Sequence, residues 1–304
     1  MVGDEYHVEM NPGTRFSKDL GVSIDVDPQN PNWKRLCPRP VMCPEGGFRL
    51  YFMAEGSFCP PGNRGVIVSA CSNDGAGWSW DVGVRIGADH SRARDRALAP
   101  DVVPLADGSW RMYFEARCTG HNDVIMSARS TDMLAWEIEE GVRVEGEHSN
   151  EHVGTPSVVP LPDGRWRLYH HMRDPARYVI VSSLSSDGIS FQRELGTRIA
   201  QTSDFETHAA YAPHVIACSE GWRMYYSGWS EQPRIQGVIM TAESKDGLFW
   251  EKHKFPVLWP DRAKDAAHCS EPSCLRLPDG RWRLYYEALA SDGTSRILSA
   301  TSSD

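Results

Sequence analysis

Short apolar strands alternate with glycine-bearing turns along this chain, and the same alternation returns five times. The clearest copy, residues 271–287, reads Glu-Pro-Ser-Cys-Leu-Arg-Leu-Pro-Asp-Gly-Arg-Trp-Arg-Leu-Tyr-Tyr-Glu, which is typical of two strands around a Pro-Asp-Gly turn. Residues 100–115 and 156–171 are close copies, and residues 40–53 and 213–227 are looser ones. The leading prolines fall at positions 40, 100, 156, 213 and 272. A fixed period built from short strands indicates a propeller or a repeat array.

Each of the first four copies carries signals for four strands, and the fifth carries the first three. A short apolar strand follows the proline, an aromatic strand follows the glycine turn, and a strand of small and β-branched residues follows that. The third strand ends in a Ser-x-Asp turn with an aromatic residue four positions after the Asp. The four examples are Ser72/Asp74/Trp78, Ser130/Asp132/Trp136, Ser185/Asp187/Phe191 and Ser244/Asp246/Trp250. We expect the aspartate to form the turn and the aromatic ring to fill the gap between neighbouring sheets.

The two ends of the chain complement each other. The fifth copy stops before its fourth strand, and residues 6–26 have no first or second strand of their own. We therefore predict an all-β, five-bladed β-propeller of four-stranded antiparallel blades with almost no helix, closed by residues 6–26 pairing with the last blade. The blades should start near residues 36, 97, 153, 209 and 269, within a single domain that spans residues 1–304.

Composition narrows the function classes. A net charge of −9 without a basic stripe argues against nucleic acid as a partner. The N-terminus lacks the pattern of a signal peptide, and no apolar run is long enough to span a membrane, so we expect a cytoplasmic protein with no membrane partner. The eight cysteines form no Cys-x-x-Cys pair, which favours reduced thiols over a zinc site. We expect no nucleotide cofactor.

Propeller topology places the variable loops and the cavity mouth on one face, where function concentrates. Candidate acid/base and charged residues beside the leading prolines are Arg39, Asp101 and Glu271. Candidate substrate-binding residues are Glu115, His171, Arg173, His214 and Trp229. A different interpretation makes Asp101 and Glu271 structural partners of Arg39, because a buried arginine needs a carboxylate.

Three histidines stand at similar places in successive copies. His152, His208 and His268 lie four or five residues before the proline of the third, fourth and fifth copies. If they converge on the axis, they could bind one divalent metal ion or one substrate. Hydrogen bonding that stiffens the loops is the alternative.

One segment carries a family resemblance. Ala99-Pro100-Asp101-Val102 resembles the Ala-Pro-Asp-Val segment of the arabinanase family's second blade, and the whole chain resembles the five-bladed propeller glycosidases. Those are the arabinanase/xylosidase, invertase/levansucrase and mannoside phosphorylase families. The resemblance implies that Asp101 orients and tunes a general acid.

Two departures from that family concern the other carboxylates. The family's first blade opens with Asp-Pro, whereas Arg39 precedes Pro40 here. Its third blade offers a Glu before the strand, where this chain has Gly154-Thr155-Pro156. Because glycoside hydrolysis normally uses two carboxylates, Glu271 is the natural replacement and Glu151 the second candidate.

Three functional hypotheses follow. The first is a carbohydrate-active enzyme, a hydrolase or phosphorylase acting on a glycoside or other polyhydroxylated small molecule, with acid/base work by Asp101 and Glu271. In it, Arg39 and Arg173 bind the substrate and Trp229 stacks on it. The second is a metal-dependent lyase, cyclase, isomerase or oxidative enzyme acting on a small metabolite through the three histidines. The third is a sugar-binding propeller without catalysis.

Overall fold

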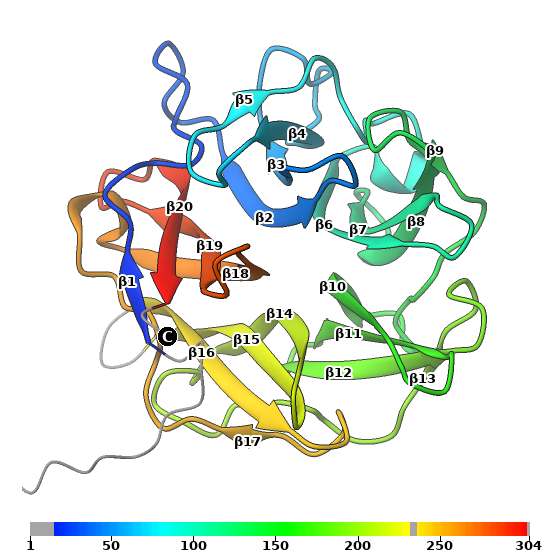
Figure 1. The fold of residues 1–304 in the computed structure, drawn as a ribbon. Helices are drawn as coiled ribbons and strands as arrows, with labels where there is room; N and C mark the ends of the chain where they lie inside the picture. The colour runs from blue at the N-terminus through cyan, green and yellow to red at the C-terminus, as the bar shows by residue number, and fades with distance from the viewer. Residues whose placement is uncertain (1–14, 232–235, 303–304) are drawn as a thin grey trace, which may run out of the picture.

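Antiparallel sets of strands stand around a common axis in the computed structural model, with β2, β6, β10, β14 and β18 innermost (Figure 1). The structure describes residues 15–231 and 236–302. The fold is all-β and has the arrangement of a β-propeller, as the repeat predicts.

The sets follow one another along the chain, and each runs from an inner to an outer strand. The first set is β2 (Arg35–Met42), β3 (Phe48–Ala54), β4 (Val66–Ser72) and β5 (Ser79–Trp80). The second is β6 (Arg96–Pro104), β7 (Trp110–Arg117), β8 (Val124–Ser130) and β9 (Glu137–Ile138). The third is β10 (His152–Pro160), β11 (Trp166–Arg173), β12 (Tyr178–Ser185) and β13 (Gln192–Arg193). The fourth is β14 (Ala209–Cys218), β15 (Gly221–Ser230), β16 (Gln236–Ser244) and β17 (Glu251–Lys252). The fifth is β18 (His268–Arg276), β19 (Trp282–Leu289) and β20 (Ser295–Ser302), with β1 (Phe16–Lys18) paired to β20.

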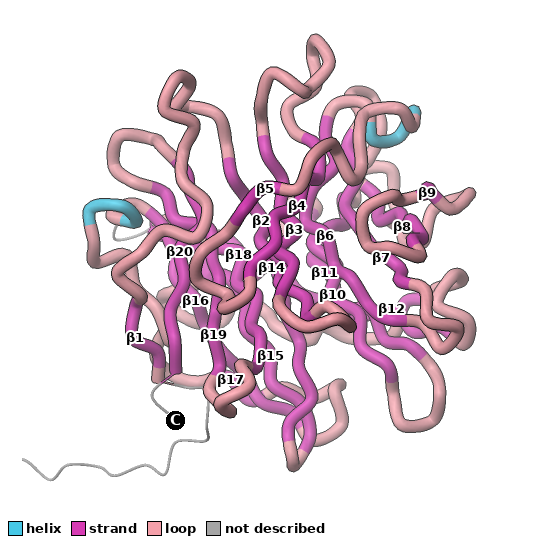
Figure 2. Tube along the Cα trace, turned by 45° about the horizontal axis from the view of Figure 1, so that its top comes forward, coloured by secondary structure: helices cyan, strands magenta, loops and turns pink. Residues whose placement is uncertain are grey.

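Helix is confined to two short 3-10 turns within the described residues, η1 (Ser91–Ala93) and η2 (Ala263–Asp265), and Figure 2 shows both in loops. Across residues 15–231 and 236–302, no helix is long and apolar enough to cross a membrane. A single parallel pair, Gly237 with His268, joins the fourth and fifth sets into one eight-stranded sheet.

The N-terminal segment adds strand pairing to the last set. Phe16 pairs with Ser302 in antiparallel register, and Ile24 forms a further bridge with Ile297. The first part of the segment predicted to do this, residues 6–14, lies outside the described residues.

Aromatic contacts join neighbouring sets, as the turn pattern predicts. The ring after each Asp turn packs edge-on against a buried tyrosine of the preceding set. The pairs are Trp136 with Tyr51, Phe191 with Tyr113, Trp250 with Tyr169, and Trp78 of the first set with Tyr285 of the fifth. Each tyrosine also donates its hydroxyl to a carbonyl of that same turn, as Tyr113 does to Gly188 at 2.8 Å. Asp187 shapes its turn by accepting the backbone N–H groups of Ile189 and Ser190, both at 2.8 Å.

Every innermost strand has a bulge at the residue before its proline. These five residues have φ between 47° and 55°, a region that residues with a Cβ rarely adopt. They are Cys37, Ala99, Thr155, Ala212 and Glu271. The ladder skips two residues there, for example between Leu98 and Asp101. The bulge frees an N–H group from the ladder and turns the residue toward the axis.

The position of the bulge shows that the sequence pattern aligned the first repeat on the wrong proline. The sequence pattern places the leading proline of that copy at Pro40, but the equivalent residue is Pro38, because the bulge lies between Leu36 and Arg39. Cys37, and not Arg39, is therefore the first set's residue before the proline. The pattern misleads because Pro40 directly precedes the apolar pair Val41-Met42, whereas Pro38 is followed by Arg39.

Candidate active site on the propeller axis

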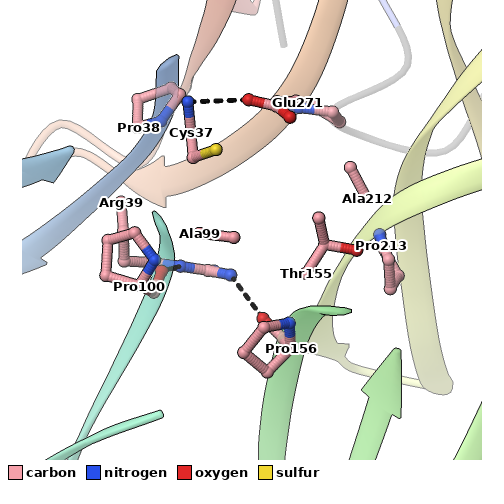
Figure 3. A pocket seen from close by; sticks show the side chains of 11 residues that line it. Cys37, Pro38, Arg39, Ala99, Pro100, Thr155, Pro156, Ala212, Pro213 and Glu271 are labelled. Atoms are coloured by element: carbon pink, nitrogen blue, oxygen red, sulfur yellow. Dashed lines mark hydrogen bonds between the residues drawn. The ribbon is translucent and has the colours of Figure 1, made fainter. Parts of the chain in front are cut away.

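The bulged residues and their prolines line one pocket on the axis (Figure 3). Arg39 also reaches it, and its cavity volume is about 20 Å³, which is room for about one water molecule. Among the described residues that line it, Glu271 is the only acidic one, and the other bulged residues contribute a thiol, two methyl groups and a hydroxyl. The pocket is therefore built by one repeat position whose side chain differs from set to set.

A layer of buried polar side chains forms the floor of this pocket. The Arg39 guanidinium lies 3.2 Å from Asp101 Oδ1, reaches 3.5 Å to the carbonyl of Pro156, and contacts His214 Nδ1. It thus touches the second, third and fourth sets at once. Asp101 also accepts the backbone N–H of Val158. These contacts tie the innermost strands together across the axis.

Burial controls the charges in that layer. Arg39, Asp101 and His214 are 7%, 4% and 8% exposed. Burial raises the pKa of Asp101 above its usual value, although Arg39 acts in the opposite direction. Burial and the nearby Arg39 hold the pKa of His214 well below its usual value, so this imidazole is neutral. One interpretation of the sequence makes Asp101 and Glu271 structural partners of Arg39. Asp101 is paired with Arg39 in this way, whereas Glu271 is not.

Glu271 belongs to a carboxyl pair on the fifth set. Its Oε2 accepts the backbone N–H of Cys37 at 2.8 Å, and a hydrogen bond joins its carboxyl group to that of Glu287. Ser270 Oγ donates to Glu287 Oε2 at 3.2 Å. Burial raises the pKa of both carboxyl groups, and repulsion by Glu271 adds to the effect on Glu287, whose pKa lies well above its usual value. Two carboxyl groups this close together favour a state in which one of them keeps its proton.

The thiol of Cys37 stays protonated beside this pair. Burial raises its pKa well above the usual value, and the nearby Glu271 carboxyl adds to the shift. A buried thiol of this kind is a poor nucleophile.

Glu115 lies behind the pocket wall on the second set. It is fully buried, and its Oε2 accepts the N–H of Thr155 at 3.0 Å, the donor that the bulge had freed. Burial opposes its ionisation, but Arg117, 2.5 Å from Oε1, and the nearby His171 lower the pKa of Glu115 below its usual value. Glu115 is thus a buried carboxylate that holds the wall in place.

Thr155 presents a hydroxyl to the pocket and is itself held from behind. Its Oγ1 lies 2.8 Å from His171 Nδ1. Burial lowers the pKa of His171 to about 4, so the ring is neutral at pH 7. Gly154 permits this packing, because a Cβ there would lie 2.0 Å from Glu115 Oε2.

Of the three histidines predicted as metal ligands, His208 and His268 both contact the ring of Trp229, whereas His152 lies beside Asp123. His152 Nδ1 lies 3.1 Å from Asp123 Oδ2, and His208 Nδ1 lies 3.2 Å from Glu231 Oε1. His268 contacts the ring of Trp229 at 6.0 Å between ring centroids. In the part of the chain that the structure describes, no group of three or more His, Cys, Asp or Glu side chains could hold a metal ion.

The remaining predicted binding residues lie near the same mouth. Trp229 is partly exposed and contacts His208 at 4.7 Å between ring centroids. The Arg173 side chain is 45% exposed and lies 3.5 Å from Asp123. Glu151, the second candidate acid, is buried and paired with Arg193 at 2.5 Å, so it does not line the axial pocket.

Sequence reasoning missed Cys37 and gave too little weight to Glu287. Cys37 was missed because the first repeat was aligned on Pro40. Glu287 is not among the candidate residues named from the sequence, although it occupies the same repeat position as Glu115 and the residues two positions later, Leu289 and Arg117, differ in charge. That difference was visible in the sequence.

Comparison with known proteins places the fold in a known group. No protein family profile matches the chain. An uncharacterized protein of Mycobacterium tuberculosis (strain CDC 1551 / Oshkosh) is 26% identical over 232 residues, which cover 70% of this chain and 75% of that protein.

Several solved structures superpose on nearly the whole length of this chain. A putative glycoside hydrolase from Parabacteroides distasonis ATCC 8503 superposes with a TM-score of 0.74 at 15% identity, covering 93% of this chain and 95% of that one. A structure from the GH130 family of mannoside phosphorylases gives 0.74 at 14% identity, covering 98% and 95%. A thermostable family-43 glycoside hydrolase gives 0.71 at 16% identity, covering 89% of both chains. The fold is that of the glycosidase-type β-propellers.

Proposed function

We propose that this protein is a carbohydrate-active enzyme that acts on a glycoside or another polyhydroxylated small molecule in the axial pocket. Residues 1–304 would form a single five-bladed propeller, closed where β1 pairs with β20. The observation that supports this most directly is Glu271, a partly exposed carboxyl group that a strained bulge turns into the pocket. The fold shared with glycoside hydrolases and a phosphorylase family agrees with it.

The proposed roles divide by depth along the axis. Glu271 does acid/base work at the pocket. Asp101 and Arg39 are saturated by each other and by the strands around them, so in this proposal they hold the floor and do not contact the reacting atoms. Thr155 would bind a substrate hydroxyl, and Trp229 at the mouth would stack on a sugar face.

The separation of the carboxyl groups favours one reaction type over another. Hydrolysis with two carboxylates places them roughly 5–10 Å apart on opposite sides of the bond. Here Glu271 and Glu287 touch each other, and the remaining carboxylate nearby, Glu115, is fully buried. A phosphorolytic reaction needs no second carboxylate as base, because phosphate is the nucleophile. The metal-dependent alternative is not favoured by any ligand group among the described residues.

The test is a panel of p-nitrophenyl glycosides and unlabelled oligosaccharides, each assayed with and without inorganic phosphate. We expect turnover of at least one substrate and a loss of at least about 100-fold in kcat in Glu271→Gln, the usual scale for a general acid or base. Glu231→Gln is the control, since this carboxylate is exposed at the mouth and does not line the pocket. No release of sugar from any member of the panel would contradict the proposal.

A further inference from the structure

Glu287 lies directly beside Glu271, and the backbone explains why. The bulge follows Ser270, which pairs with Glu287 in the β18–β19 ladder. Glu271 therefore leaves the ladder one residue after Ser270 and turns back over Glu287. We infer that Glu271 and Glu287 work as one acid/base unit on a single wall of the axial pocket, sharing one proton and exchanging protons with one face of the substrate. This inference rests on the proposed function and deepens it.

Accessibility separates this pair from the other carboxylate in the same repeat position. Glu271 and Glu287 are both partly exposed, whereas Glu115 is fully buried behind its wall. Arg117 neutralises Glu115. The pair of Glu271 and Glu287, here called the dyad, has no arginine or lysine among its hydrogen-bond or ion-pair partners in residues 15–231 and 236–302. A carboxyl pair that is partly exposed, has Glu271 in the pocket lining and has no arginine or lysine in hydrogen-bond or ion-pair contact among the described residues is arranged for proton exchange.

The hydrogen bonds assign the shared proton. Oε2 of Glu271 accepts a backbone N–H from Cys37, which favours the ionised form of this group. Glu287 receives a hydroxyl from Ser270 at 3.2 Å, a longer hydrogen bond than the 2.8 Å one from Cys37 to Glu271. Glu287 therefore carries the proton and donates it to Glu271, which carries the charge. The greater rise in the pKa of Glu287 agrees with this assignment.

The titratable and charged groups that face the dyad come from several elements. They are Lys34 before β2, Cys37 of β2, Glu115 of β7, Tyr178 of β12 and Tyr211 of β14. Burial raises the pKa of the Cys37 thiol and of both tyrosines, so at pH 7 these three are neutral. Titration of the pocket near neutral pH is therefore expected to come from the dyad.

The proton balance of a turnover follows from this arrangement. The ionised Glu271 accepts a proton from a hydroxyl group of the incoming nucleophile or of the substrate, so that an O–H bond breaks there and one forms on Glu271. The O–H bond of Glu287 breaks as the departing or carbonyl oxygen of the substrate takes that proton. The dyad has a charge of −1 before and after, and nothing is oxidised or reduced. Because both carboxyl groups lie on the fifth set, both transfers occur on the same side of the substrate.

The first experiment uses Glu287→Gln, which keeps the size of the side chain and a hydrogen-bond donor but holds no acidic proton. We expect the infrared spectrum of the wild-type protein at pH 7 to contain a protonated-carboxyl C=O band that this variant lacks, while Glu231→Gln retains it. The band does not depend on knowing a substrate. If wild type and Glu287→Gln have the same carboxyl bands, the shared proton does not exist and the inference is overturned.

The second experiment measures the pH dependence of kcat on a substrate found in the glycoside panel. We expect a bell-shaped profile in the wild-type protein, a fall in kcat of about 100-fold or more in Glu287→Gln, and loss of the alkaline limb, because glutamine has no proton to lose. Ser270→Ala removes one donor from Glu287, and here we expect a shift of that limb with a smaller change in kcat. An unchanged alkaline limb in both variants would overturn the inference. If no substrate is found, the proposed function fails, and the infrared comparison still decides whether the pair shares a proton.

Discussion

The second and fifth sets carry the same residue at the same place and put it in opposite states. Glu115 pairs with Leu98 in the β6–β7 ladder, and Glu287 pairs with Ser270 at the equivalent place in the β18–β19 ladder. Glu115 is fully buried and has a lowered pKa, whereas Glu287 is partly exposed and has a raised one. The repeat therefore determines where a carboxyl group stands, and its neighbours determine what it does.

Two neighbours account for the difference. Arg117 follows Glu115 by two residues on the same face of its strand, while Leu289 stands at that distance from Glu287. The bulged residue beside Glu115 in its own set is Ala99, whereas Glu271 stands beside Glu287. The second set places a cation beside its glutamate, whereas the fifth set places a second carboxyl group there.

The largest expected effect comes from removing that cation. In Arg117→Leu the buried Glu115 loses its ion-pair partner, and breaking a buried pair in this way costs about 3 kcal/mol or more in the free energy of unfolding. Urea denaturation at pH 7 measures it. Arg173→Leu is the matched control, because this side chain is 45% exposed and should cost less than about 1 kcal/mol. Equal losses in the two variants would show that burial of Glu115 does not set the cost.

A second test concerns the repeat position one residue before the glutamates. This position holds Phe114 in β7, Tyr286 in β19 and the buried His170 in β11. Burial lowers the pKa of His170 to about 3. The unfolded chain binds a proton at this histidine below about pH 6.5 and the folded protein does not, so stability is lost as the pH falls from 6.5 toward 3.

His170→Phe removes this contribution and introduces the residue found in β7. We expect the free energy of unfolding of the variant to fall less between pH 7 and pH 5 than that of the wild-type protein, by up to about 1.4 kcal/mol per pH unit below 6.5. Urea midpoints at the two pH values provide the measurement. An equally steep loss in both proteins would mean that other groups cause the acid sensitivity.

The smallest expected effect comes from giving the fifth set the cation of the second. In Leu289→Arg a guanidinium stands two residues after Glu287, as Arg117 stands after Glu115. An opposite charge nearby lowers the pKa of a carboxyl group by roughly one unit or more, so the alkaline limb of the pH profile and the protonated-carboxyl band should both move to lower pH. Leu289→Met is the neutral control. If neither signal moves, the missing cation is not what keeps the dyad protonated.

Local patterns predicted much of the architecture and only part of the site. The Asp turns and the aromatic rings that follow them could be assigned because each lies within a few residues of its partners or repeats at a fixed place. Glu271 could be named as a pocket residue from its place beside Pro272. The misalignment of the first repeat shows the limit of this approach, since two prolines competed there and only the ladder register distinguished them.

The sequence by itself determined the repeat, the four-strand pattern of each copy and the residue types available near the axis, because these depend on contacts that are short in sequence. The tertiary structure alone decided which of those residues meet. Arg39 reaches Asp101 and His214 from other sets, and Cys37 provides an N–H group to Glu271 across 234 positions of the chain. The charge states of these side chains follow from those contacts, because burial and neighbouring charges act through distance in space and not along the chain.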